Sequence, residues 1–151
     1  MLRTGTGRAF TSKSCDEGRS WTEAAASSVK NPDTKLNMLS WNGLPEHTLL
    51  LAFNNHKGYA DAGCRKCRTH LTIAMSHDGG AGWRALTVVE KAKIDYKKAH
   101  YPTLFQVGCD RVLLVFSRGY SCCAPADAEL GIQLVSYKFD STTALQNKPI
   151  H

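Results

Sequence analysis

Short runs of apolar and β-branched residues, separated by turn residues, recur along the whole chain. The runs cover residues 8–13, 22–29, 36–41, 48–53, 70–75, 84–89, 102–107, 111–116 and 131–137. Segments rich in Gly, Asn, Asp, Ser and Pro stand between many of them. Runs of this length bounded by turn residues predict β-strands. We therefore expect an all-β domain built from repeated antiparallel sheets.

Two of the turns share one octapeptide. Residues 14–21 (SCDEGRSW) and residues 76–83 (SHDGGAGW) both read S-x-D-x-G-x-x-W. Four fixed positions would match by chance in about one chain in a thousand, so two copies indicate a repeat. Asp accepts hydrogen bonds from the amides of its own turn, Gly tolerates positive φ, and Trp packs a turn against a sheet. The pattern predicts two equivalent hairpin turns.

The repeat has a period of about 60 residues. Asp16 and Asp78 are separated by that distance, and so are Phe53 and Phe116, which end corresponding strands. With this period, residues 1–30 form the end of one sheet, residues 31–90 a complete four-stranded sheet, and residues 91–151 an incomplete last sheet. The large aromatic residues of the strands and turns are expected in the core: Trp21, Trp41, Phe53, Trp83 and Phe116.

The two octapeptides resemble the Asp-box, or BNR, repeat of sialidases and related β-propellers. In that family the box closes the hairpin between the third and fourth strands of a blade, away from the active site. The resemblance therefore implies a structural role for Asp16 and Asp78. It also implies a partial six-bladed β-propeller of about two and a half blades of antiparallel four-stranded sheet, as the C-terminal part of a larger propeller. We expect such an open stack to be marginally stable alone, because it exposes sheet edges.

Strand connectivity places the candidate chemistry at the ends of the sheets opposite the boxes. Arg3, the loop 54–68, the linker 90–101 and the loop 117–129 should share that face. The face is rich in groups that can bind an anion or line its site: Arg3, Lys57, Tyr59, Arg65, Lys66, Arg68, Tyr101, Arg118 and Tyr120.

Three segments of this face resemble parts of a sialidase site. The family binds the substrate carboxylate through three arginines, whose planar fork suits a carboxylate, and it uses a Tyr nucleophile. Residues 68–72 (RTHLT) resemble the third-arginine segment and residues 2–4 (LRT) the second, which makes Arg68 and Arg3 the expected substrate-binding residues. Residues 101–104 (YPTL) resemble the Tyr-Ser-x-Leu nucleophile segment, with Pro102 in place of the commoner Ser. Tyr101 is thus the expected catalytic residue, and His100 beside it an expected bystander.

The resemblance implies an exo-α-sialidase type of glycosidase that cleaves terminal sialic acid, or a related anionic sugar, from glycans without a metal or other cofactor. The first arginine, the acid/base Asp and the Glu partner of the Tyr have no match in this chain. A phenol with a pKa near 10 is a poor nucleophile at neutral pH without such a base, so we expect this chain alone to be inactive. The alternative is a non-catalytic Asp-box propeller that binds glycans or proteins.

Charge and hydropathy exclude other classes of function. The chain has 19 Lys and Arg against 13 Asp and Glu, a net charge of +6, which attracts anionic partners. The basic residues are scattered and form no recognition helix or aromatic stacking surface, so no nucleic-acid partner is expected. No apolar stretch reaches the roughly 18 residues of a membrane span, and residues 1–5 lack the apolar region of a signal peptide. The sequence thus leaves the cellular location open.

Six cysteines leave two readings of their chemistry open. They are Cys15, Cys64, Cys67, Cys109, Cys122 and Cys123. A CxxC pair such as Cys64 and Cys67 suggests zinc or redox chemistry, but the adjacent Cys122 and Cys123 point opposite ways on extended backbone and make a poor second ligand pair. Loop disulfides or free thiols are favoured over a metal. Paired cysteines would favour an extracellular or endomembrane compartment.

The repeat predicts a specific disulfide. Cys64 and Cys67 fall in one loop and Cys122 and Cys123 in the corresponding loop of the next sheet. In an oxidising compartment, a disulfide between these loops would close about 60 residues and stabilise the fold by about 4 kcal/mol. Peptide mapping of the unreduced protein should recover this cross-link. Recovery of Cys64 linked only to Cys67, or ready alkylation of all four thiols, would contradict it.

Overall fold

The computed structural model describes residues 1–42, 48–57, 68–90, 97–120 and 130–139. Within these ranges the regular structure consists of β-strands alone. The strands are β1 (Arg8–Thr11), β2 (Ala25–Lys30), β3 (Asn37–Ser40), β4 (Leu49–Asn54), β5 (Leu71–Ser76), β6 (Arg84–Glu90), β7 (Lys97–Val107), β8 (Arg111–Tyr120) and β9 (Gly131–Lys138). The all-β prediction is confirmed.

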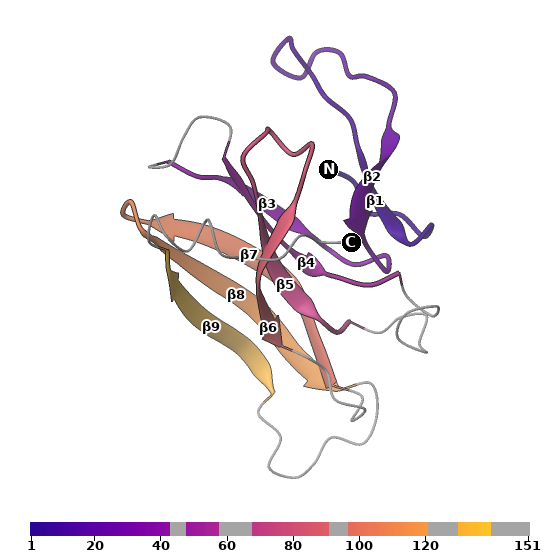
Figure 1. Cartoon of the computed structure of the whole chain (residues 1–151). Helices are drawn as coiled ribbons and strands as arrows, with labels where there is room; N and C mark the ends of the chain where they lie inside the picture. The colour runs from indigo at the N-terminus through magenta and orange to yellow at the C-terminus, as the bar shows by residue number, and fades with distance from the viewer. Residues whose placement is uncertain (43–47, 58–67, 91–96, 121–129, 140–151) are drawn as a thin grey trace.

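The strands form three antiparallel sheets in which neighbours in sequence are neighbours in space. Their orders are β1-β2, β3-β4-β5-β6 and β7-β8-β9. An isolated bridge between Leu2 and Phe10 extends the first sheet by one position. Figure 1 shows the four-stranded sheet between the β1-β2 hairpin and the β7-β8-β9 sheet. Consecutive pairing of this kind is typical of repeated meander sheets.

The four-stranded sheet is buried on both of its faces. Leu50 and Ala52 of β4 pack with Leu114 and Phe116 of β8 in one apolar cluster. The alternate residues of β4 pack on the other face, where they meet the first sheet: Leu51 and Phe53 lie with Ala9, Val29, Ala74 and Trp83. Each fully buried Leu or Phe side chain of these clusters contributes about 1.5–3 kcal/mol to folding. Because both faces are covered, β4 and β5 read as continuous apolar runs.

Side-chain amides join the sheets along their inner strands. Asn37 of β3 accepts a hydrogen bond from the Leu104 amide of β7 at 2.8 Å. Gln106 exchanges two hydrogen bonds with the backbone of Asn42. Asn54, fully buried at the end of β4, donates to the carbonyls of Thr69 and Ala99 at 2.8 and 2.9 Å. These bonds fix the β7 sheet against the β3-β6 sheet.

The two octapeptides form equivalent turns. In the turn after β5, the Ser76 hydroxyl donates to Asp78 at 2.7 Å and accepts from the Gly80 amide at 2.8 Å. Asp78 also accepts from the Gly82 amide, and the Trp83 indole donates to the Gly80 carbonyl.

The turn after β1 repeats this network. Ser14, Asp16 and Gly18 make the corresponding bonds, and Ser20 donates to Asp16 through both its amide and its hydroxyl. The Ser20 hydroxyl and amide, with Ser14, lower the pKa of Asp16 to about 2. Because this folded pKa lies below the unfolded value of 3.8, the turn's contribution to stability is complete above that value and is lost as pH falls towards 2.

The structure corrects the burial predicted for Trp21. Trp41, Phe53, Trp83 and Phe116 are buried as predicted, but Trp21 is 64% exposed. Its indole Nε1 donates to its own turn at the Gly18 carbonyl, as Trp83 does to Gly80. Trp83 has Leu51 and Phe53 of β4 to pack against, whereas the turn that carries Trp21 has no sheet beneath it in the described part of the chain.

Strand β7 begins before its predicted start. The apolar pattern predicted a strand over residues 102–107, but β7 runs over Lys97–Val107. Residues 97–100 pair with residues 117–120 of β8. This pairing is made by backbone groups, so the charged residues Lys97 and Lys98 hide it from a hydrophobicity pattern. The first part of β7 therefore occupies what the sequence suggested to be a linker.

We expect Gly79→Ala to cost about 1 kcal/mol, because Gly79 has a φ of 68° and an alanine there is strained although nothing else lies within 4 Å. The equivalent residue of the first turn is Glu17, with a φ of 59°. Glu17→Gly should therefore stabilise the chain by less than about 1 kcal/mol. Urea unfolding followed by Trp fluorescence measures both. Gly5→Ala, in open space without positive φ, is the control, and an equal cost for Gly5→Ala and Gly79→Ala would contradict the account.

We expect Asn54→Ala to destabilise the chain by about 2–4 kcal/mol, since it leaves two buried carbonyls without a donor. Asn42→Ala is the matched control, because Asn42 is exposed and bonds Gln106 through its backbone. Chemical denaturation of both variants gives the comparison. Equal stability of the two would show that the Asn54 amide does not join the sheets.

Candidate functional site

The candidate site lies where β5 begins and β7 approaches it. Arg68 stands just before β5, and Tyr101 lies within β7. The Ala99 amide donates to the Arg68 carbonyl at 2.7 Å, which joins the two segments directly. The turn of Asp78 follows the opposite end of β5. The geometric prediction that Arg68 and Tyr101 lie together, at the end of the sheet away from that box, is confirmed.

Tyr101 is held in a strained position. The register of β7 and β8 shifts between His100, opposite Ser117, and Thr103, opposite Val115. Tyr101 and Pro102 thus form a bulge, where the missing N–H of Pro102 interrupts no ladder bond. Tyr101 has a φ of 55°, which costs about 1–3 kcal/mol for a residue with a side chain. Strain of this kind is typical of functional sites. Tyr101 is also 46% exposed.

The Arg68 guanidinium contacts Tyr101. Its Cζ atom lies 4.9 Å from the centroid of the Tyr101 ring. A side-chain hydrogen bond from Arg68 and then its positive charge lower the pKa of the Tyr101 phenol; burial opposes them, and the charge of Arg3 adds the smallest lowering effect. A more acidic phenol is more easily activated as a nucleophile. The site thus brings Arg68 and Tyr101 together, and Arg3 lies close enough for its charge to act on the phenol.

Arg3 completes the positive side of the site. Its Nε lies 3.4 Å from the Asp33 carboxylate, and these side chains are 51% and 57% exposed. An exposed ion pair of this kind contributes only about 0–1 kcal/mol. The Arg3 guanidinium is therefore held loosely enough to turn towards an anionic ligand. Its role in binding stays a prediction, as do those of Arg68 and Tyr101.

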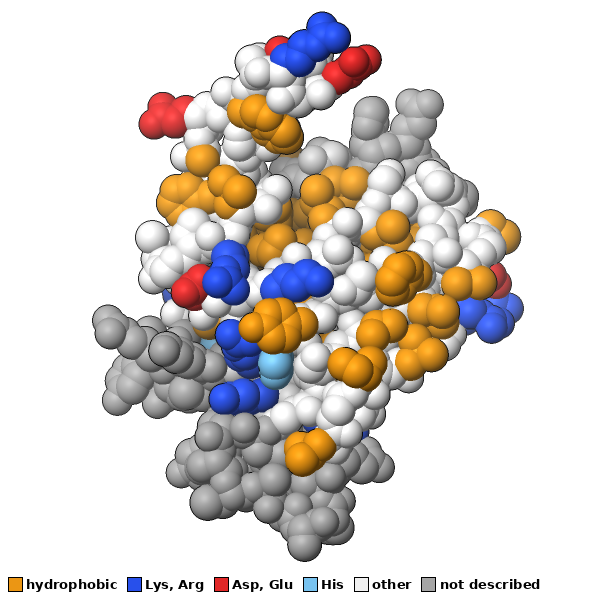
Figure 2. Space-filling model, turned by 180° about the vertical axis from the view of Figure 1, so that it is seen from behind, with side chains coloured by type: hydrophobic (Ala, Val, Ile, Leu, Met, Phe, Trp, Pro, Cys, Tyr) orange, Lys and Arg blue, Asp and Glu red, His pale blue; other side chains and the backbone are white. Residues whose placement is uncertain are grey.

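His100, expected to be a bystander beside Tyr101, contacts both Arg68 and Tyr101, and Asn54, which the sequence did not select, also lies at the site. His100 Nδ1 lies 3.2 Å from Arg68 Nη1, and its ring packs edge-on to Tyr101 with centroids 4.6 Å apart. Figure 2 shows a His side chain bordered by Lys and Arg side chains on this surface. Asn54 acts through the backbone on either side of the site. The His100–Tyr101 contact joins neighbours in sequence, but the contacts of His100 with Arg68 and of Asn54 with Ala99 join residues far apart, so no local pattern marks them.

Arg118 does not join the predicted anion-binding group. Its Nε lies 3.2 Å from the Glu90 carboxylate, and the two side chains are only 17% and 10% exposed. Lys57 is exposed. Tyr59, Arg65 and Lys66 of the predicted face, the Tyr120 side chain, and Cys64, Cys67, Cys122 and Cys123 lie outside the part of the chain that the structure describes.

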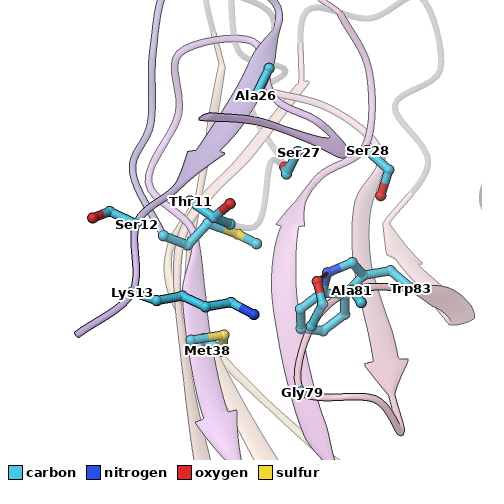
Figure 3. A pocket seen from close by; sticks show the side chains of 12 residues that line it. Thr11, Ser12, Lys13, Ala26, Ser27, Ser28, Met38, Gly79, Ala81 and Trp83 are labelled. Carbon is cyan, nitrogen blue, oxygen red and sulfur yellow. Dashed lines mark hydrogen bonds between the residues drawn. The ribbon is translucent and has the colours of Figure 1, made fainter. Parts of the chain in front are cut away.

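A separate cavity of about 330 Å³ lies at the other end of the sheets. It is lined by Thr11, Lys13, Ser27, Met38 and Trp83, among others, from the first hairpin, β3 and the second octapeptide turn. Figure 3 shows the Lys13 amino group directed across this space towards Trp83. Arg3, Arg68 and Tyr101 do not line it, so the cavity is a gap between sheets on the box side.

The described ranges hold neither a cluster of metal-binding side chains nor a helix that could span a membrane. No three His, Cys, Asp or Glu side chains there are placed to hold a metal ion. Cys15 and Cys109 are exposed free thiols. No helix in those ranges is long and apolar enough to cross a bilayer.

Comparison with known families agrees with the two octapeptide turns. Residues 1–112, about three quarters of the chain, match the BNR repeat-like domain. The match includes both octapeptides together with Arg3, Arg68 and Tyr101. No curated protein matches the chain. Repeated sheets, equivalent Asp turns and the family match together show that this chain belongs to the BNR repeat-like domain family.

Proposed function

We propose that the chain supplies part of the active site of a sialidase-like glycosidase, which removes terminal sialic acid or a related anionic sugar from a glycan. The observation that supports this most is the Arg68–Tyr101 pair, built at a strained bulge of β7. Arg68 and Arg3 would bind the substrate carboxylate. The Tyr101 oxygen would attack the anomeric carbon as the glycosidic bond breaks, while a base from another part of the intact protein takes the phenol proton and an acid there protonates the leaving oxygen. Neither step requires a metal.

The charge distribution supports an anionic ligand. A carboxylate placed beside Tyr101 would meet Arg68, and Arg3 is close enough for its charge to affect the same phenol. An arginine fork offers two parallel hydrogen bonds to a carboxylate. The arginines that bind the carboxylate and the tyrosine nucleophile would thus be adjacent, as glycoside cleavage requires.

A larger propeller forms part of the same proposal. The outer face of the β7-β8-β9 sheet is apolar, and Phe105, Val107, Ile132 and Leu134 on it are 45–72% exposed. The other face of this sheet is covered by the β3-β6 sheet. We propose that sheets of the same kind continue the stack into a six-bladed propeller, of which this chain is the C-terminal part. Residues 1–30, 31–90 and 91–151 would then belong to three successive blades.

The alternative is a non-catalytic propeller that binds an anionic glycan or a protein. One observation favours it: the described carboxylates near the site are engaged elsewhere, with Asp33 on Arg3 and Glu90 on Arg118. A base for Tyr101 would have to come from another part of the protein, so this chain alone should not turn over substrate. In the intact propeller protein, Tyr101→Phe distinguishes the two functions, because an enzyme would lose turnover of a fluorogenic sialoside and keep binding, while a binding protein would show no turnover before or after the change.

We expect Arg68→Lys, in the intact propeller protein, to weaken substrate binding by about 1.5–3 kcal/mol, because an ammonium keeps the charge and loses the fork. The measurements are the dissociation constant for sialic acid and kcat/KM on a fluorogenic sialoside. Folding should change little, as thermal unfolding would show. Arg19→Lys is the matched control, since it makes the same change at an exposed arginine of the first octapeptide turn. Unchanged kinetics in Arg68→Lys would remove Arg68 from the site.

A further inference from the structure

His100 contacts both Arg68 and Tyr101. It precedes Tyr101 and therefore begins the β7 bulge. Its imidazole Nδ1 lies 3.2 Å from Arg68 Nη1. Its ring meets the Tyr101 ring at an interplanar angle of 64°. One residue thus touches both members of the Arg68–Tyr101 pair.

We propose that His100 is a positioning residue that, in its neutral form, holds Arg68 against the Tyr101 ring, so that acid separates the pair by protonating the imidazole. The meaning of this device for a substrate rests on the proposed function. The contact itself does not, because it is made without a ligand.

The direction of the hydrogen bond follows from the donor inventory of arginine. A guanidinium has five N–H donors, no acceptor, and a charge that it keeps at all ordinary pH values. His100 Nδ1 must therefore accept with its lone pair, and the ring proton sits on Nε2. On that side of the ring lies Gly119 of β8, where even an added Cβ would come no closer than 4.0 Å to Nε2. The imidazole is confined between Arg68, Tyr101 and β8.

The contact to His100 uses only one of the donors of Arg68. The remaining N–H groups are left for the Tyr101 side chain and for an anion. A guanidinium fixed at one corner loses less conformational entropy when it binds a carboxylate than a free one does. This is how a residue that touches no substrate can raise affinity.

The charges around His100 set the direction of its response to pH. Arg68 faces it from the segment before β5, and Lys98 lies two residues before it on β7. On β8, the residue opposite His100 is Ser117. The next residue, Arg118, points to the other face of the β7-β8 pair, where it forms its ion pair with Glu90. Tyr101 is a further titratable neighbour. Burial first, and then the charges of Arg68 and Lys98, lower the pKa of His100 below its ordinary value of 6.5.

Protonation of His100 would therefore weaken its contact with Arg68 in two ways. It would replace the acceptor Nδ1 with a second donor facing Arg68, and it would place two positive charges about 3 Å apart. Because the pKa is lowered, the Arg68–Tyr101 pair should persist through neutral pH and separate only on the acid side of 6.5. An anion site with this device binds at neutral pH and releases in acid.

Two variants separate the acceptor from the ring. His100→Asn offers an amide oxygen near the place of Nδ1 and does not titrate. His100→Phe keeps the ring contact with Tyr101 and has no acceptor. His77→Asn, in the second octapeptide turn, is the control for loss of a histidine away from the site.

The first readouts need no ligand and use the chain as it stands. Nitrogen NMR of the imidazole at neutral pH should show His100 with its proton on Nε2 only. The titration of the imidazole should have its midpoint below pH 6.5. The pKa of the Tyr101 phenol should rise in His100→Phe, since Arg68 is released, and should return towards the wild-type value in His100→Asn. A proton on Nδ1, or an unchanged Tyr101 pKa in His100→Phe, would overturn the proposal. If His100→Phe does not fold, the wild-type tautomer and His100→Asn decide it.

The second readout tests the consequence for binding, with free sialic acid as the probe on the intact propeller. Affinity at neutral pH should fall about tenfold in His100→Phe, the equivalent of one hydrogen bond to a charged group. His100→Asn should bind at neutral pH and lose the acid-induced release that the wild type shows. Absence of binding in every variant, with the NMR readouts as expected, would overturn the proposed function and leave the positioning role supported. Acid release that persists in His100→Asn would overturn the switch.

Discussion

The burial of the four-stranded sheet on both faces is the constraint on which the rest of the structure depends. Strands β4 and β5 can alternate their side chains between two apolar clusters only because β7-β8-β9 covers one face and the β1-β2 hairpin the other. A sheet enclosed in this way leaves its edges and the ends of its strands as the places where polar groups reach solvent. The octapeptide turn closes one end of β5, and Arg68 stands at the other. The side chains at the Arg68 end can therefore vary, because hydrogen-bonded turns hold the opposite end.

Features that depend on local chemistry could be predicted from the sequence. The octapeptide turns follow from Ser, Asp and Gly within one short segment, so their form and equivalence were evident. Most strands followed from apolar runs for the same reason. Features that depend on distant partners could not be predicted in this way. The first part of β7 is held by pairing with β8, and Asn54 and His100 act on groups 15 to 45 residues away. Trp21 shows the converse error, since its motif is intact and its burial depends on a neighbouring sheet.

The strain at Tyr101 is connected to the contacts that surround it. A tyrosine with φ of 55° would relax into an ordinary strand conformation unless other interactions fixed both flanks of the bulge. The Ala99 amide bonded to Arg68 and the Ala99 carbonyl bonded to Asn54 fix the side before it. The pairing of Leu104 with Leu114 and the hydrogen bond that the Leu104 amide donates to Asn37 fix the side after it. The same bonds that join two sheets thus hold the side chain that the proposed reaction needs.

Positive charge near the site divides into two kinds with different freedom. Arg118 is committed to Glu90 in a mostly buried pair, where removal of either partner would leave an uncompensated charge. Arg3 and Arg68 are held by weaker contacts, an exposed carboxylate and a neutral imidazole. A ligand carboxylate can compete with an exposed ion pair and can add to a neutral acceptor, but it cannot displace a buried partner without a large penalty. Net charge alone would count all three arginines as anion-binding groups, whereas the nature of each partner favours Arg3 and Arg68 for the proposed binding role.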